Sequence, residues 1–344
     1  MRTLLPIALA AAFIATAALF APRAETPAEL QTSAARAFLA SLSDAERAQA
    51  TAEFDATART DWHFVPRERA GIALGALGDA SRLAARRLFA SGLSKEGMQT
   101  FEGIVVLEQV LLDLDRARGV AQSIRDPGRY HVLVCGEPGG ERWSWRVEGH
   151  HVSVHFTHVG GATTTTPLFW GANPARVTDG ARAGLSVLGA REQLARELAA
   201  SLTLEQRQRA GSAEVPAEVL YEPSVVVAPT EERGIPVREL SAEQRTRFVA
   251  LFELHARELR GALAEREIEA LRAELERARF VWHGEPDAGK ACYYALERPG
   301  ASVEYVNVLN GANHAHCMWR DFARDFGRDP LREHLRADHA PAGK

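Results

Sequence analysis

The feature that most constrains the fold is a short strand pattern that occurs twice in the chain. "WRVE" at 145–148 matches "YALE" at 294–297, and "SVHF" at 153–156 matches "SVEY" at 302–305, with the same 149 positions between the members of each pair. "GEP" at 136–138 recurs at 284–286, and "GAN" at 171–173 recurs at 311–313. Because these matches keep one order, they predict a duplicated unit.

The two copies alternate β-branched or aromatic residues with polar ones, which is typical of strands. Apolar residues recur at helical spacing in 26–119, 185–210 and 241–280. Helix starts are indicated near Ser43 and at Ser241, which stands three residues before Gln244 in a capping-box arrangement.

We therefore expect an α+β fold with a mixed or antiparallel sheet and helical layers, built from two related halves that form one compact unit. Residues 25–210 would hold a helical layer and the first hairpin unit. Residues 211–234 would be a connection. Residues 235–344 would hold one long helix, the second hairpin unit and a C-terminal helix whose arginines and aspartates recur four apart from Arg320 onward.

Residues 1–24 have the order of a secretory signal peptide: Arg2, an apolar run from Leu4 to Ala21, and small residues at the end. Cleavage between Ala17 and Ala24 would leave a periplasmic or secreted protein with no membrane attachment. The alternative is a retained membrane anchor, since the run approaches the length that spans a bilayer.

Charge and motifs exclude several classes of function. The net charge of −4 and the pI near 6.3 offer no basic field for nucleic acid, so a small-molecule partner is expected; the oligomeric state stays open. A phosphate-binding G-x-x-x-x-G-K-[ST] loop is absent, so no nucleotide cofactor is expected, and the H-E-x-x-H and G-x-S-x-G patterns are absent too. Three cysteines, Cys135, Cys292 and Cys317, allow at most one internal disulfide, and for Cys317 we expect burial or a disulfide.

Histidines gather in two windows. In "GHHVSVHF", His151 and His155 fall on the polar side of a predicted strand, about 13 Å apart, so one metal ion can use only one of them. His150 falls on the apolar side or at a turn. In "ANHAHCMWRD", His314 and His316 point the same way if the segment is extended, with Cα atoms about 6–7 Å apart.

The spacing predicts a metal site formed by His151, with or without His150, together with His314 and His316, and completed by Glu304 or His155. Such ligands suit zinc, iron or copper, with a position open for water or substrate. Glu148, Glu304 and Asp321 are candidate acid–base groups or groups that hold a ligand side chain in place, and Arg320 is a candidate for orienting a ligand or binding an anion.

We therefore expect a metal-dependent enzyme acting on a small molecule, by oxidation or hydrolysis. The first alternative is a non-enzymatic protein that binds a metal or a small ligand, with an apolar pocket lined by Trp143, Trp145, Trp170 and Trp319. The second is a helical and sheet scaffold without chemistry, which would leave the histidines dispersed.

Three strings carry a resemblance to a known family: "WSWRVEGHHVSVHF", "PLFWGANPARV" and "ANHAHCMWRDFARDFGRDPLREHL". With "DWHFVPRERAGIAL" and "FVWHGEP", they make the chain similar to the family called domain of unknown function 3500 over nearly its whole mature length. The resemblance implies an exported protein and no particular activity. The family more often has asparagine at the position of His155, which favours His150, His151, His314 and His316 as the ligands.

Overall fold

The computed structural model describes residues 25–121, 123–228 and 232–328. The predicted signal peptide at 1–24 and the predicted helix beyond residue 328 lie outside the described residues. Within the described part of the chain, no helix is both long enough and apolar enough to cross a membrane.

The described residues form one sheet of 12 strands, in the order β1-β3-β4-β5-β7-β12-β11-β10-β9-β8, with β2 beside β3 and β6 beside β5. The strands are β1 (Thr51–Ala52), β2 (Ile72–Ala73), β3 (His131–Cys135), β4 (Arg142–Gly149), β5 (Val152–Val159), β6 (Ala162–Thr164), β7 (Leu168–Ala172), β8 (Ile235–Pro236), β9 (Arg279–Gly284), β10 (Cys292–Arg298), β11 (Ala301–Val308) and β12 (His314–Asp321). The β1–β3 pair is parallel and the other described pairs are antiparallel. The predicted α+β fold with a mixed sheet is confirmed.

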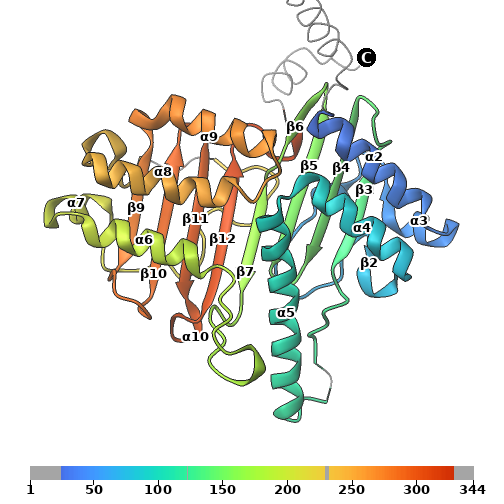
Figure 1. The fold of residues 1–344 in the computed structure, drawn as a ribbon, viewed down its shortest axis with the longest axis horizontal. Coiled ribbons are helices and arrows are strands. Elements are labelled where there is room, and N and C mark those ends of the chain that lie inside the picture. The colour runs from blue at the N-terminus through green and yellow to red at the C-terminus, as the bar shows by residue number, and fades with distance from the viewer. Residues whose placement is uncertain (1–24, 122, 229–231, 329–344) are drawn as a thin grey trace, which may run out of the picture.

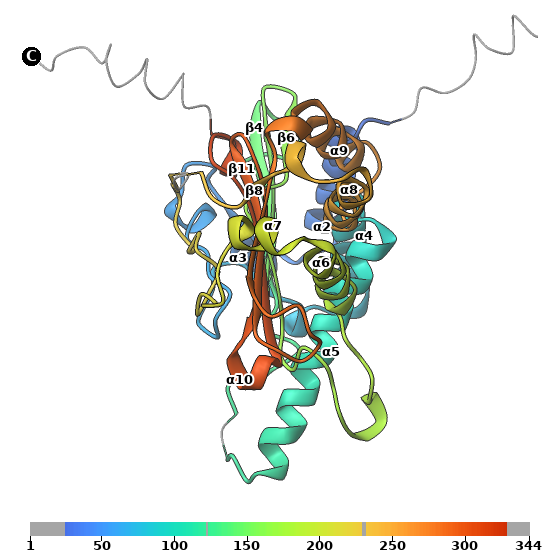
Figure 2. The ribbon, with the colours of Figure 1, turned by 90° about the vertical axis from the view of Figure 1, so that its left-hand side faces the viewer.

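Most of the helices cover one face of the sheet, and the loops 53–71 and 211–228 cross the other, as Figures 1 and 2 show. The helices are α2 (Pro27–Ala40), α3 (Asp44–Ala50), α4 (Asp79–Gly92), α5 (Lys95–Ala117), α6 (Gly189–Ser201), α7 (Leu204–Ala210), α8 (Ala242–Ala256), α9 (Ala262–Glu274) and the short turn α10 (Leu309–Ala312). Capping boxes start α3 at Ser43 and α8 at Ser241, where the sequence predicted helix starts.

The two halves have a similar order of elements: two helices, short strands with 3₁₀ turns, two more helices, and the main strands. The first half has two such short strands, β1 and β2, and the second half has one, β8. β5 and β11 occupy 152–159 and 301–308, which are the same positions under the 149-residue spacing of the sequence motifs. The halves meet at the centre of the sheet, where β7 pairs with β12. A common origin of the two halves stays a prediction.

The prediction of one long helix from Ser241 was wrong, because the chain leaves the helix between α8 and α9. At this junction Arg260 N donates to Gly92 O (2.8 Å), and Ser94 N donates to Glu258 O (2.9 Å). Backbone groups of Glu258 and Arg260, which a continuous helix would bond within itself, are thus hydrogen-bonded to the junction between α4 and α5. Gly261, at φ 49°, starts α9 in a conformation that glycine adopts readily.

The prediction of helical ion pairs from Arg320 onward was also wrong for the described residues. β12 continues to Asp321, so Arg320 stands in a strand and its guanidinium pairs with Asp325 (Nε–Oδ2 2.5 Å). Asp321 accepts instead from the backbone N–H of Arg324 (2.9 Å) and from its Nε (2.9 Å), as the cap of a turn. The alternation of strand β12 outweighs the four-residue charge spacing here because its apolar side chains are buried.

The main apolar core lies between the sheet and the helices. Trp143, Trp145, Trp170 and Trp319 all belong to this core, each at most 3% exposed. The expected pocket lined by these four tryptophans is therefore not formed. A smaller core, which includes Trp62, Phe64 and Phe169, lies on the loop side of the sheet.

The three cysteines are all buried and free, so Cys317 is buried without a disulfide. Burial raises the pKa of Cys292 and of Cys317 to about 12. Because the thiolate is the reactive form, these two thiols are inert at neutral pH.

His155, His158 and His255 are buried in their neutral form. Burial lowers the pKa of His158 to about 4. Burial, with further lowering by Arg146 for His155 and by Arg191 for His255, holds the pKa of those two histidines well below the usual value. The unfolded chain binds protons at these positions near pH 6.5, and the folded chain does not.

We therefore expect the free energy of unfolding to fall as the pH falls from about 6.5 toward 4, by at most ~1.4 kcal/mol per pH unit for each such histidine. Urea unfolding at a series of pH values measures this slope. His158→Phe keeps a ring against Trp143, whose centroid lies 4.2 Å from that of His158, and removes one titrating group. The variant should show a shallower slope, and an unchanged slope would contradict the assignment.

Candidate metal centre

A tight turn between β4 and β5 carries His150 and His151. His151 was expected on the strand with His155, but it occupies the turn at φ 63°, a left-handed conformation that is uncommon for histidine. Two backbone hydrogen bonds hold it: His151 N donates to Phe64 O (2.9 Å), and Gly171 N donates to His151 O (2.7 Å). Such strain persists where surrounding structure enforces it, and it gathers at functional sites.

The second histidine window is extended, as the sequence predicted. His314 and His316 stand at alternate positions of β12, so their side chains leave the same face, the loop side. Ala315 and Cys317 point into the helix-side core. Before the strand, Asn310, Gly311 and Ala312 all have positive φ (54°, 69° and 59°), and this turn brings the chain back into β12.

The sheet brings His151, His314 and His316 together. The Nε2 atoms of His151 and His314 lie 2.9 Å apart, those of His314 and His316 3.0 Å apart, and those of His151 and His316 3.3 Å apart. Three nitrogens each about 2.05 Å from one metal ion would lie about 2.9 Å apart at right angles and about 3.3 Å apart at tetrahedral angles. The geometry therefore fits a metal ion held by three histidines.

A carboxylate that the sequence did not point to orients one of these ligands. Glu218 comes from the 211–234 loop, and its Oε2 and Oε1 lie 2.7 and 2.8 Å from His316 Nδ1. In neutral His316 this places the proton on Nδ1, so the Nε2 lone pair faces the other two histidines. Burial alone would raise the pKa of Glu218, but the hydrogen bond and charge of His316 outweigh it and the pKa is lowered.

The protonation states suit metal binding. Burial, then the neighbouring histidines His150, His316 and His314, hold the pKa of His151 well below its usual value. Burial and the nearby His316 and His150 lower the pKa of His314 to about 4. Because metal ligation needs the neutral imidazole, these two side chains need release no proton at pH 7.

Aromatic rings close one side of the histidine triad, defined here as His151, His314 and His316. Phe64 stacks on Phe169 with ring centroids 4.0 Å apart, and these rings lie 5.0 and 5.3 Å from the ring of His316. His151 and His316 are 4% and 5% exposed, whereas His314 is only partly buried. The triad is therefore dry on the phenylalanine side and reaches solvent at His314.

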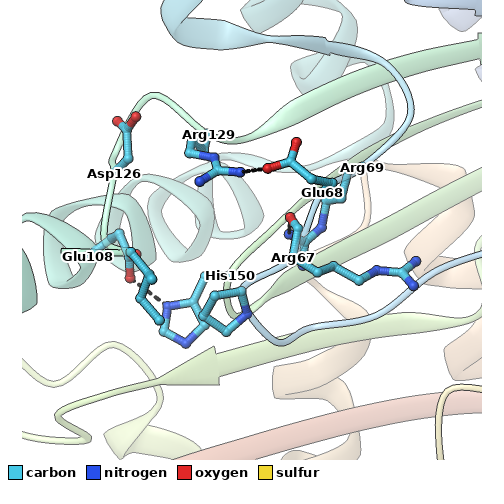
Figure 3. Close-up of a pocket in the computed structure, with 9 residues that line it drawn as sticks. Arg67, Glu68, Arg69, Glu108, Asp126, Arg129 and His150 are labelled. Carbon is cyan, nitrogen blue, oxygen red and sulfur yellow. Dashed lines mark hydrogen bonds and ion pairs between the residues drawn. The ribbon is translucent and has the colours of Figure 1, made fainter. Parts of the chain in front are cut away.

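His150, the fourth predicted ligand, lies beside the triad and not in it. Its ring stacks on that of His151 (centroids 3.8 Å), and its Nδ1 lies 2.6 Å from Oε2 of the buried Glu108. His150 also lines a pocket of about 230 Å³ between α5 and the 63–69 loop, which Figure 3 shows with Arg67, Asp126 and Arg129 on its walls. The His150 ring thus lies between this pocket and the ring of His151.

His155, a possible ligand, and Glu148, a candidate acid–base group, have structural partners. His155 Nε2 lies 2.9 Å from Ser153 Oγ, and its ring packs edge-on against Trp62 and Phe326. Glu148 forms buried ion pairs with Arg69 (2.8 Å) and Arg146 (3.1 Å).

Three other candidates bind neighbouring chain segments. Glu304 accepts from the backbone N–H groups of Leu220 and Tyr221, and Arg320 donates to two backbone carbonyls of the same loop. Asp321 caps the turn after β12.

A glycine makes room for the triad. Gly171 on β7 pairs with His316 in the sheet, and a Cβ at this position would lie 2.6 Å from Cδ2 of His151. We expect Gly171→Ala to push the His151 ring out of place and to weaken metal affinity at least tenfold while the chain stays folded. Zinc titration followed by calorimetry measures this effect. Gly78→Ala is the matched control, because a Cβ there meets nothing within 4 Å; equal affinities in the two variants would contradict the packing argument.

Comparison with known protein families gives a match over most of the chain. No curated protein and no solved structure matches the chain. A family model described as "Protein of unknown function (DUF3500)" matches residues 24–328, which include all three triad histidines, Glu218 and Gly171. The resemblance seen in the sequence strings is therefore confirmed: the chain belongs to the DUF3500 family.

Proposed function

We propose that the protein is an exported metal-dependent enzyme that acts on a small molecule, with zinc, iron or copper bound by His151, His314 and His316. The proposal rests on how the three Nε2 atoms meet. The identity of the metal would determine the type of reaction: zinc suits hydrolysis by a bound water, and iron or copper suits oxidation.

The observation that carries the proposal is that the three Nε2 atoms cannot satisfy one another. In a neutral imidazole each ring nitrogen is either an N–H donor or a lone-pair acceptor. Three atoms in two states must include at least one like pair, and all three pairs here are within 3.3 Å. Two facing lone pairs or two facing N–H groups repel, whereas one cation accepts all three lone pairs. A purely hydrogen-bonded cluster is therefore the poorer explanation.

The ligand count favours an enzyme over a closed structural site. Catalytic zinc sites have three protein ligands and keep a position for water or substrate, whereas structural sites are closed by four protein ligands. Among the described residues, the group that can hold a metal ion together consists of the three histidines. The partial exposure of His314 supports access of a small molecule to that position.

The proposed location outside the cytoplasm rests on the N-terminal sequence. Residues 1–24 carry the order of a signal peptide, which supports work outside the cytoplasm. A net charge of −4 supports a small-molecule substrate over nucleic acid.

The test is metal content, measured by elemental analysis on protein purified without a His tag and again after incubation with zinc, iron or copper. We expect about one metal ion per chain in the wild type and none in His314→Ala/His316→Ala. His283→Ala is the control: this histidine belongs to β9, its Nδ1 lies within hydrogen-bond distance of Ser212 Oγ, and its loss should leave the metal in place.

Three results would decide between the candidate functions. Turnover of ester, amide or phenolic probes that disappears with the metal would support the enzyme. One bound metal with no turnover of any probe would favour the non-enzymatic metal-binding protein. No metal in the wild type after incubation would end the metal proposal.

A further inference from the structure

A short stretch of the long connection crosses the loop side of the sheet and carries the partner of His316. We call residues 218–224 the Glu218 strap. Val219 and Tyr221 are buried, at 2% and 4% exposed, and the side chain of Leu220 between them is 44% exposed. The strap has no helix or strand of its own, so its backbone polar groups need partners from elsewhere.

The buried carboxylate of Glu304 supplies the first of these partners. Glu304 is fully buried on β11, and its Oε1 and Oε2 accept from the backbone N–H of Leu220 (3.1 Å) and of Tyr221 (3.0 Å). Tyr293 donates its hydroxyl to the same carboxylate, and Arg233 lies 3.3 Å from it. One carboxylate therefore fixes two consecutive backbone groups that begin two residues after Glu218.

The buried guanidinium of Arg320 supplies the second. Arg320 is fully buried on β12, and it donates to the carbonyl oxygens of Glu222 (2.9 Å) and Ser224 (2.8 Å). Arg320 stands four residues after His316 on the same face of the same strand. The backbone N–H groups of the strap thus bind the carboxylate of Glu304 on β11. Its backbone carbonyl groups bind the guanidinium of Arg320 on β12, the strand that carries two triad histidines.

We propose that Glu304 is a positioning residue of the metal centre, and that it acts through Glu218. By holding Leu220 and Tyr221, Glu304 fixes where the strap passes and keeps the Glu218 carboxylate against His316 Nδ1. This role rests on the metal binding proposed above. It replaces both roles expected from the sequence, a metal ligand and an acid–base group, because both oxygens of Glu304 are occupied by the strap and its neighbours.

A purely structural role for Glu304 would predict something different. If Glu304 only stabilised the fold, its loss would lower stability and leave the metal site of the folded molecules unchanged. If it acts through Glu218, its loss weakens metal binding in molecules that are folded. The effect should then disappear once the Glu218 carboxylate has been removed, because the two changes share one route.

The experiment is a double-mutant cycle on zinc affinity, with Glu218→Gln, Glu304→Gln and the double variant, each checked for folding by its thermal transition. Loss of a carboxylate behind a ligand histidine costs roughly 10–100-fold in metal affinity. We expect Glu218→Gln in that range, Glu304→Gln about tenfold weaker than wild type, and the double variant no more than twofold weaker than Glu218→Gln alone. Cobalt(II) at saturating concentration should give the same altered visible spectrum in both single variants.

The matched control is Glu297→Gln. Glu297 pairs with the same Arg233 (2.7 Å), and no hydrogen bond or ion pair between it and the strap is seen among the described residues. Its loss should leave zinc affinity within about twofold of wild type. If Glu304→Gln does not fold, Leu220→Pro removes one strap N–H at an exposed side chain and should weaken zinc binding severalfold.

The outcomes separate this inference from the function on which it rests. Unchanged zinc affinity in Glu304→Gln, or losses that multiply in the double variant, would overturn the role of Glu304 while the metal centre stands. A wild-type protein that binds no zinc, iron or copper would overturn the metal centre, and the inference with it.

Discussion

The antiparallel pairing of β7 with β12 is the contact on which the rest of the structure depends. Each half of the chain has its own helices and strands, and this pairing joins them into one sheet. It also sets the register that places Gly171 opposite His316, so that the His151 turn of the first half lies over the histidines of the second. A slip of one residue would turn His314 and His316 toward the helices and dissolve the triad.

Sequence patterns predicted the helices and strands well where neighbouring residues along the chain determine them. Alternation predicted the strands, and the Ser43 and Ser241 capping boxes start helices where they were expected. The single long helix failed because the break before α9 depends on backbone groups of Gly92 and Ser94, some 165 residues earlier in the chain. The helical reading of Arg320 failed because burial on β12 outweighs the spacing of its charges.

The sequence predicted the histidines of the candidate site but not the carboxylate that supports them. In any extended chain, residues two apart such as His314 and His316 point to the same side. The pairing of that window with His151 followed from the two histidine-rich strings. Glu218 carried no signal, because a glutamate in a proline-containing connection looks like any solvated residue. Glu304 was singled out as the counterpart of His155 in the repeat, and Arg320 for its place near the histidines, but only the fold shows that both bind backbone groups.

The origin of the ligands has a consequence for when the site exists. His151 and His314 are separated by 163 residues, and their meeting requires the central strand pair. The complete ligand set is therefore absent from a nascent or unfolded chain and appears only after both halves have docked. A metal ion bound by these histidines, as proposed above, would be taken up only by the finished fold, so the ions available where the chain folds would decide its identity as much as the affinity order of three imidazoles.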